Sequence, residues 1–336
     1  MKPFKLTVFT EPIAPIGFIQ EIKSVLRPLK FFLQGKEAPQ KKKYGGHYAV
    51  TRSLLEGLKK IGIDFNYNPV KEKDITENVI VLAGVERLKE VIELKEKGRI
   101  QFLLAGPNVV DDVLSENQVV ADPAVDYYIV PSEWVKNLVI NDCIKLKDRV
   151  LCWSAGIDSQ HWKPGIGKDQ RNEVLIYWKT ESEGFYQEVV KLVKEQGMQP
   201  ALIKYGNYTV TEYKEQLNKS QFAIFISRSE SQGIALAEAW SMDVPTLVFD
   251  PGEFFFNGRM VYNASSCPYL TRSTGLVWKN PEGLKKIIGD KNSFIGFSPR
   301  EYVLKQFTDE YSAEQLIESV ELLRQRRLAG LEHISV

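Results

Sequence analysis

The sequence predicts an α/β protein made of two doubly wound domains, each with a parallel sheet covered by helices. Three observations predict this. Short apolar runs typical of buried strands alternate with amphipathic helical patterns along most of the chain. The segment 154–172 has no apolar period and carries Gly156, Pro164, Gly165 and Gly167, as expected of a linker. The length of 336 residues corresponds to about two domains.

The first block of alternation predicts strands and helices in order. Strands are expected at 4–10, 63–67, 79–83, 100–105, 127–130 and 149–153. One helix is expected at 49–60, closed by Gly62, and another at 86–97, stopped by Gly98. Ser132 is expected to be the N-cap of a third helix. Before them, an amphipathic segment at 17–35 precedes a basic stretch at 36–43.

The second block continues the same pattern after the linker. Strands are expected at 174–178, 201–205, 222–227 and 246–249, and helices at 184–196, 209–218, 232–242 and 312–327. We therefore expect a first domain at 1–160 and a second at 165–306, with a C-terminal helix at 309–330 packing back onto the first domain. Because such sheets bind ligands outside the carboxyl ends of their strands, two facing domains would hold the ligand in the cleft between them.

Composition excludes several classes of protein. Lys and Arg number 44 against 43 Asp and Glu, so the net charge of +1 lacks the basic excess of a nucleic-acid binder. The three cysteines are scattered, with no Cys-x-x-Cys pair, which excludes a disulfide framework and a zinc ribbon and favours the cytoplasm. No apolar run approaches the roughly 18 residues needed to span a bilayer. The three histidines lie far apart and no Asp-x-Asp occurs, so we expect no metal site.

The segment 222–250 is the most informative in the chain. An apolar strand ends at Ser227, a polar turn follows, and Gly233 opens an Ala-rich helix. This arrangement aims backbone N–H groups and the positive end of a helix dipole at the end of the strand, which suits a phosphate. Two carboxylates, Glu230 and Glu238, flank this anion site.

Their spacing of eight residues carries little information, because Glu173/Glu181 and Glu310/Glu318 share it. The surrounding pattern of strand, polar turn, glycine and small-residue helix is what distinguishes Glu230 and Glu238.

The stretch 230–248, ESQGIALAEAWSMDVPTLV, resembles the signature of retaining glycosyltransferases with the GT-B fold, and is most similar to glycosyltransferase family 4. VPSEW at 130–134, AGID at 155–158, WKP at 162–164 and FSPREYV at 297–303 extend the resemblance, which covers the chain from about residue 127 onward. It implies a GT-B architecture of two Rossmann-like domains facing across a cleft.

The resemblance also implies roles for the residues that match the motif. Glu230 would bind hydroxyls of the donor sugar, and Glu238 would hold the ribose of the nucleotide, since a carboxylate accepts two hydrogen bonds from a vicinal diol. The backbone N–H groups of Gln232, Gly233 and Ile234 would face the diphosphate.

In the family, an Arg and a Lys after the first strand of the second domain neutralise the leaving diphosphate. Lys179 can supply one cation, unless it is an ordinary surface lysine, whereas Glu183 or a neighbouring acid occupies the usual second position. Arg228 is expected to compensate, because charge develops on the diphosphate in the transition state. Tyr205 and Gly206 lie where the family contacts the base; Tyr205 would either stack on the base or pack against the protein.

In the first domain the family has a glycine pair whose backbone meets the donor phosphate and the acceptor, and Gly45 and Gly46 match it, although an ordinary turn also explains them. His47 would line the acceptor pocket or merely begin a helix. Asn108 follows the carboxyl end of a strand and so faces the cleft. The basic stretch 36–43 would contact an anionic membrane surface, on the inner face, or form a solvated loop.

The expected activity is that of a hexosyl- or glycosyltransferase of EC class 2.4. It would transfer a sugar from a nucleotide-sugar donor to a hydroxyl acceptor with retention, without a metal or any cofactor. The acceptor class stays open among glycans, lipid-linked acceptors and small molecules. Two alternatives remain: a nucleotide-sugar epimerase on the same fold, which the scarcity of histidines disfavours, and a catalytically silent protein that binds a nucleotide sugar or a partner.

Overall fold

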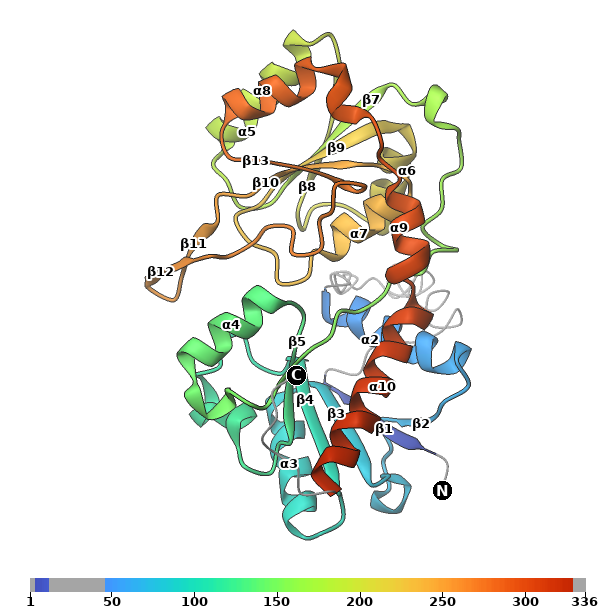
Figure 1. The fold of residues 1–336 in the computed structure, drawn as a ribbon, viewed down its shortest axis with the longest axis vertical. Helices are drawn as coiled ribbons and strands as arrows, with labels where there is room; N and C mark the ends of the chain where they lie inside the picture. Colours follow the sequence, from blue (N-terminus) through green and yellow to red (C-terminus); the bar gives the residue numbers. More distant parts are fainter. Residues whose placement is uncertain (1–3, 12–45, 329–336) are drawn as a thin grey trace, which may run out of the picture. The chain divides into compact units, whose positions relative to one another are not determined.

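The computed structural model describes residues 4–11 and 46–328 (Figure 1). The chain divides into two compact units between Tyr128 and Ile129. The expectations for Gly45, for the amphipathic segment 17–35 and for the basic stretch 36–43 fall outside the described residues. Within the described part of the chain, no helix is long and apolar enough to cross a membrane.

The first sheet has six strands in the order β2-β1-β3-β4-β5-β6. They are β1 (Lys5–Thr10), β2 (Asp64–Tyr67), β3 (Asn78–Ala83), β4 (Phe102–Asn108), β5 (Tyr127–Val130) and β6 (Val150–Cys152). The associated helices are α2 (Gly46–Lys60), α3 (Val85–Glu96) and α4 (Glu133–Asp142). The pairings from β2 to β5 are parallel, and every residue of β3 is buried, which explains its continuous apolar sequence.

The second sheet has five strands in the order β13-β10-β9-β7-β8, all paired in parallel. They are β7 (Glu173–Trp178), β8 (Gln199–Lys204), β9 (Ser220–Ile226), β10 (Thr246–Phe249) and β13 (Gly275–Trp278). Its helices are α5 (Glu183–Glu195), α6 (Val210–Lys219), α7 (Ile234–Ser241), α8 (Pro281–Gly289) and α9 (Pro299–Gln306), followed by α10 (Asp309–Leu328). Two doubly wound α/β domains are thereby confirmed.

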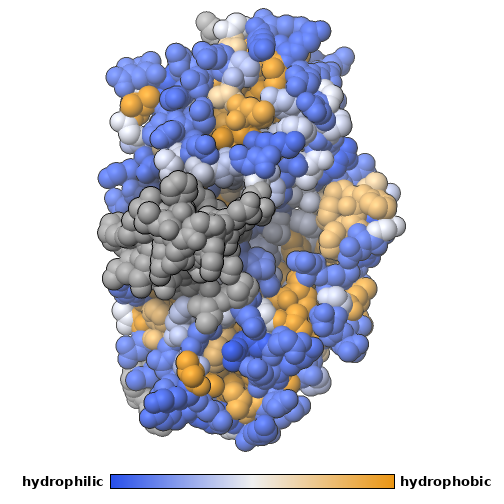
Figure 2. Space-filling model, turned by 180° about the vertical axis from the view of Figure 1, so that it is seen from behind, coloured by the Kyte–Doolittle hydropathy of each residue, from blue (hydrophilic) through white to orange (hydrophobic). Residues whose placement is uncertain are grey.

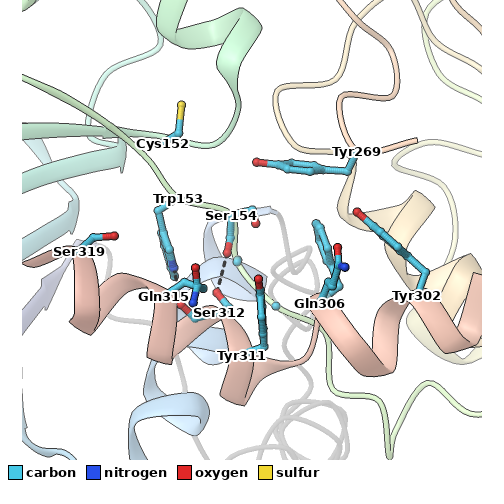
Figure 3. Close-up of a pocket in the computed structure, with 13 residues that line it drawn as sticks. Cys152, Trp153, Ser154, Tyr269, Tyr302, Gln306, Tyr311, Ser312, Gln315 and Ser319 are labelled. Atoms are coloured by element: carbon cyan, nitrogen blue, oxygen red, sulfur yellow. Dashed lines mark hydrogen bonds between the residues drawn. The ribbon is translucent and has the colours of Figure 1, made fainter. Parts of the chain in front are cut away.

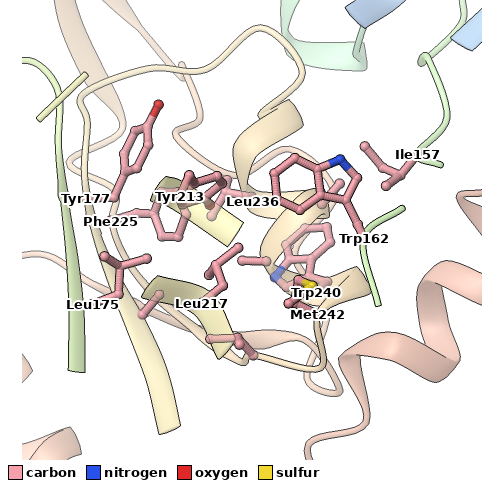
Figure 4. Packing of buried hydrophobic residues seen from close by; sticks show 14 of the residues in the cluster. Ile157, Trp162, Leu175, Tyr177, Tyr213, Leu217, Phe225, Leu236, Trp240 and Met242 are labelled. Atoms are coloured by element: carbon pink, nitrogen blue, oxygen red, sulfur yellow. The ribbon is translucent and has the colours of Figure 1, made fainter. Parts of the chain in front are cut away.

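Two hydrophobic clusters cover the two faces of the second sheet. Successive residues of a strand point to opposite faces, so Leu175 and Tyr177 of β7 pack in one cluster and Val174 and Ile176 in the other. Figure 4 shows the first cluster, in which Trp240 of α7 belongs to the buried core. Trp240 is 2% exposed, so the packing of α7 fixes this helix against the sheet.

The predicted domain boundaries at 160 and 165 stay predictions. Strand pairing places β6 in the first sheet, whereas the division into compact units comes earlier, after Tyr128.

The C-terminal helix α10 makes hydrogen bonds within its own unit. The Trp153 indole donates to Ser312 O at 2.9 Å, and the Ser312 hydroxyl donates to Ser154 O at 2.6 Å. Its packing onto the first domain also stays a prediction.

The sequence reading missed a β-hairpin formed by β11 (Glu253–Phe256) and β12 (Arg259–Tyr262). Its two-residue turn has φ of 46° at Asn257 and 80° at Gly258, and Asn-Gly is the usual signal for such a turn. Phe255 is 68% exposed and Tyr262 is 67% exposed. In Figure 2, which is seen from behind, a pale orange hydrophobic patch lies at the right-hand edge, on the side of this hairpin. The strand β13 and the helices α8 and α9 were also missed.

Candidate functional site

The strand order of the second sheet reverses between β7 and β9. The chain passes from β7 outward to β8 and then returns to the other side of β7 to form β9. Such a switch point leaves room for a ligand outside the carboxyl ends of the two strands. Lys179 follows the last residue of β7, and its backbone N–H donates to Ile226 O at the end of β9, at 3.0 Å. Topology alone therefore places Lys179 at the candidate site.

Lys179 and Glu230 form an ion pair at this point. The Lys179 Nζ donates to Glu230 Oε1 at 2.8 Å and to Oε2 at 2.9 Å. The two side chains are 24% and 18% exposed, so the pair is largely shielded from solvent. The Nζ also lies 4.8 Å from the centroid of the Tyr205 ring, a cation–π distance. Tyr205 is itself 51% exposed, so part of its ring stays accessible to a ligand.

Arg228 is held by a different acid. Its Nε forms an ion pair with Glu181 Oε1, and its backbone N–H donates to the Thr180 hydroxyl at 3.0 Å. Glu183 is the first residue of α5, after the N-cap Ser182. Glu181 is therefore the acid that pairs with Arg228. The sequence did not predict this pairing.

A cluster of tyrosines lies beside the two glutamates. The Tyr177 and Tyr208 hydroxyls share a hydrogen bond of 3.0 Å, and the Tyr213 hydroxyl donates to Ala235 O at 2.7 Å. Burial raises the pKa of Tyr208 to about 12; the negative charges of Glu238 and Glu230 add to the rise, while the hydrogen bond from Tyr177 opposes it. Both carboxylates therefore lie near the Tyr208 hydroxyl. The tyrosines have no distinctive spacing, so no feature of the sequence predicts this cluster.

The helix α7 begins next to these groups. Its N-cap Gly233 has φ 81° and ψ 52°, a left-handed conformation, and a Cβ there would lie 2.9 Å from Leu236 Cδ1. Glycine is the residue that accepts this conformation without strain. The first-turn N–H groups of a helix, here from Ile234 onward, have no intrahelical acceptor, and no acidic residue occupies that turn. The helix start can therefore receive an anion, as the sequence predicts.

The loop before α7 is held by contacts with the segment 132–155. The Gln232 side chain is 7% exposed, and its amide accepts from Ala155 N at 3.0 Å and donates to Ala155 O at 2.7 Å. The Ser132 hydroxyl donates to Ser231 O at 2.6 Å, and the Trp134 indole donates to Glu230 O at 3.0 Å. The sequence predicted only that the backbone N–H of Gln232 faces the diphosphate. The two hydrogen bonds of its side chain, which hold the loop against Ala155, were not predicted.

Ser132 occupies the predicted N-cap position of α4, but its side chain makes no capping hydrogen bond. The prediction that Ser132 is the N-cap residue is confirmed, while its hydroxyl donates to Ser231 O and accepts no hydrogen bond from a backbone N–H of α4.

Of the remaining predicted residues, Gly206 is next to Tyr205 in the chain, and Gly46, His47 and Asn108 lie in the first unit. Gly206 has φ 81° and follows Tyr205 at the end of β8. Gly46 and His47 are the first two residues of α2 and are exposed. Asn108 is the last residue of β4, and its buried Nδ2 has no hydrogen-bond partner among the described residues. The predicted strand ending at Ala105 is too short, since β4 extends through Asn108.

Within the ranges 4–11 and 46–328, no group of three or more His, Cys, Asp or Glu side chains is arranged to hold a metal ion. None of the three cysteines forms a disulfide. Burial raises the pKa of the Cys152 thiol to about 12, with a smaller contribution from Glu133, and burial likewise raises the pKa of Cys267 to about 12. These two thiols are protonated at neutral pH and are poor nucleophiles.

No protein-family model matches the chain, and no curated protein is similar enough in sequence to count as a relative. Solved structures do match. The catalytic domain of starch synthase IV from Arabidopsis thaliana, bound to ADP and acarbose, is 11% identical with a TM-score of 0.54, and the match covers 96% of this chain and 100% of that one.

Two further structures match over nearly the whole of both chains. AviGT4, a glycosyltransferase involved in avilamycin A biosynthesis, is 11% identical with a TM-score of 0.54, covering 98% of this chain and 99% of that one. The apo form of the lipopolysaccharide outer core galactosyltransferase WaaB is 11% identical with a TM-score of 0.53, covering 94% and 99%. At this identity the similarity establishes the fold alone: the chain has the fold of GT-B glycosyltransferases, with two Rossmann-like α/β domains.

Proposed function

We propose that this protein is a retaining glycosyltransferase, related to family 4, that moves a sugar from a nucleotide-sugar donor to a hydroxyl acceptor. The observation that carries the proposal is the Lys179–Glu230 pair at the switch point of the second sheet, beside the start of α7. A cation, a carboxylate and a row of backbone N–H groups meet there. These are the groups needed to bind a diphosphate next to a polyhydroxylated sugar.

Each group has a part in donor binding. The diphosphate is received by the start of α7, through the N–H groups of Gln232, Gly233 and Ile234. Glu238 accepts hydrogen bonds from the ribose diol, and the accessible face of Tyr205 stacks on the base near Gly206. When the donor enters, the Lys179 ammonium turns from Glu230 to a phosphate oxygen, and the released Glu230 carboxylate accepts hydrogen bonds from sugar hydroxyls.

The chemical step follows from this placement. The bond between the anomeric carbon and the diphosphate oxygen breaks, and the leaving phosphate oxygen takes the proton of the acceptor hydroxyl. The acceptor oxygen then bonds to the anomeric carbon on the same face. Lys179, assisted by Arg228, stabilises the charge that develops on the diphosphate, and the bound geometry supplies the alignment. We propose that no metal ion takes part and that His47 and Asn108 serve the acceptor side. The backbone of the glycine pair Gly45–Gly46 would meet the donor phosphate and the acceptor.

Incubation with UDP-, ADP-, GDP- and CDP-sugars tests the proposal. Release of a nucleoside diphosphate, from hydrolysis or from transfer to an added acceptor, is the expected result. NMR of the product reports the anomeric configuration, which should match that of the donor. Binding of no donor in thermal-shift and calorimetric assays would reject the proposal, since a ligand of the native state raises its stability.

A second candidate is a protein that binds a nucleotide sugar without turning it over. Both cations of the site are matched by acids, Lys179 by Glu230 and Arg228 by Glu181, and this matching weakens the positive field that a leaving diphosphate needs. Saturable donor binding with no release of diphosphate, in the presence of glycan, lipid-linked and small-molecule acceptors, would favour this candidate.

We also propose a cytoplasmic location, which the absence of a disulfide among the three cysteines supports. We include in the proposal a peripheral contact of the basic stretch 36–43 with an anionic membrane. Sedimentation with phosphatidylserine vesicles tests this contact, and loss of binding at high salt is the expected result.

A further inference from the structure

A pocket of about 260 Å³ lies within the second unit, apart from the residues assigned to the donor (Figure 3). It is bordered by the segment 152–156, by Tyr269, and by residues of α9 and α10. In Figure 3 the Tyr269 and Tyr302 rings and the Gln306, Tyr311 and Gln315 side chains surround the same open space. Neither Lys179 nor any residue of the loop before α7 lines it.

Some polar groups of the pocket serve the fold. The Tyr269 hydroxyl donates to Pro131 O at 2.6 Å, and the Ser312 hydroxyl donates to Ser154 O at 2.6 Å. Other groups are available. The Tyr302 and Tyr311 hydroxyls and the Gln306 side-chain amide have no hydrogen-bond partner among the described residues. A tyrosine hydroxyl is protonated at neutral pH and can donate, and burial raises the pKa of Tyr302 further.

The lining carries no charge. None of the 13 residues that line the pocket is Lys, Arg, Asp or Glu. A phosphate, a carboxylate or an amine entering it would lose solvation without gaining an oppositely charged partner. The lining instead offers aromatic rings beside hydroxyl and amide groups. A neutral sugar has matching chemistry, because its C–H face packs on aromatic rings and its hydroxyls both donate and accept hydrogen bonds.

We propose that this pocket binds a neutral saccharide unit, at a site separate from that of the nucleotide sugar. The volume is slightly below the range of about 300–1,000 Å³ for pockets of drug-sized ligands, so we expect a single sugar ring as the occupant. The Tyr302 and Tyr311 hydroxyls and the Gln306 amide make the hydrogen bonds. This proposal does not rest on sugar transfer, because it concerns binding in the absence of any nucleotide.

The test is calorimetric titration, supported by ligand-observed NMR, of the full chain with glucose, galactose, N-acetylglucosamine and maltose. Saturable binding of at least one probe by the wild type is expected. Tyr302→Phe and Tyr311→Phe remove one hydroxyl each and keep the ring, so each should weaken binding about three- to tenfold through loss of one hydrogen bond. Gln306→Ala should weaken it to a similar extent.

The matched control is Tyr262→Phe, which removes a hydroxyl from an exposed ring outside the pocket and should leave binding unchanged. Circular dichroism and the unfolding midpoint verify that each variant folds. Saturation by none of the four sugars overturns the proposal, as does equal binding by wild type, Tyr302→Phe and Tyr311→Phe. Glu238→Ala separates the two sites: it should weaken nucleotide binding and leave sugar binding unchanged.

Discussion

The Lys179 ammonium donates to both carboxylate oxygens of Glu230, at 2.8 and 2.9 Å, although the two residues are 51 positions apart in the chain. The two charges neutralise each other in this pair. Under the proposed function, a donor that draws Lys179 to its diphosphate would also release Glu230 for its sugar. The pair would then link recognition of the two ends of one substrate.

Lys179→Ala should lower the rate of transfer about 100-fold or more, because one charge-assisted contact in a preorganised site is worth about 3 kcal/mol. Affinity for the nucleoside alone should change little. Steady-state kinetics and nucleoside titration measure the two effects. Lys204→Ala is the control, since Lys204 also lies at a strand end and stacks on an aromatic ring, that of Trp178. An unchanged rate in Lys179→Ala would transfer the cationic role to Arg228.

The two glutamates should behave differently. Glu238→Ala should weaken binding of every nucleoside diphosphate about 10- to 100-fold, because a hydrogen bond to a charged group contributes roughly 1.5–3 kcal/mol. Glu230→Ala should depress transfer while keeping diphosphate affinity near the wild-type value or slightly above it, since the variant frees Lys179. Calorimetry with UDP and ADP, alongside turnover, measures both. Glu318→Ala, on the exposed face of α10, is the control, and identical behaviour of all three variants would refute the assignment.

Activity should survive excess EDTA. The described residues form no metal-binding cluster, and under the proposed function the start of α7 together with Lys179 would provide the positive charge that a metal would otherwise supply. The measurement is turnover before and after chelation. Loss of activity on chelation, with recovery on adding Mg²⁺ or Mn²⁺, would show that the reaction depends on a metal.

Gly233→Ala should lower the free energy of unfolding by about 1–2 kcal/mol, because an alanine in the left-handed region is strained and its Cβ would displace the Leu236 side chain. Gly184→Ala is a suitable control, since Gly184 lies in α5 with no atom within 4 Å of an added Cβ. Urea denaturation measures both. Equal stability of the two variants would show that the loop relaxes around the new methyl group.

Stability should fall between pH 10 and pH 12. Burial raises the pKa of Tyr208 and of Tyr269 from 10.0 to about 12, and raises the pKa values of Tyr177 and Tyr213 as well. The unfolded chain loses these protons above pH 10, while the folded chain keeps them. Each of these tyrosines therefore lowers the free energy of unfolding by about 1.4 kcal/mol per pH unit in this window. Thermal unfolding across the window measures the slope. Tyr208→Phe should make it shallower.

Local pattern predicted the strand–turn–helix at 222–241 and most element boundaries within two residues, because buried parallel strands and amphipathic helices have distinct periods. It could not predict the partner of a side chain. Glu230 and Lys179 meet because β7 and β9 pair across the switch point, and the hydroxyl of Ser132, the predicted N-cap of α4, donates to Ser231 O. The hairpin at 253–262 was predictable, since Asn257-Gly258 carries its turn signal.

The Gln232 side chain makes the same two bonds to Ala155 that a neighbouring peptide group would make. A primary amide can do so because it carries a donor and an acceptor side by side. Glutamate has nearly the same shape, but it would set a negative oxygen against the Ala155 carbonyl in a buried position. Replacing Gln232 by glutamate exchanges one nitrogen for an oxygen, yet it should destabilise the loop before α7. Substitutions at residue 232 should therefore be tolerated according to their hydrogen-bonding groups and not according to their volume.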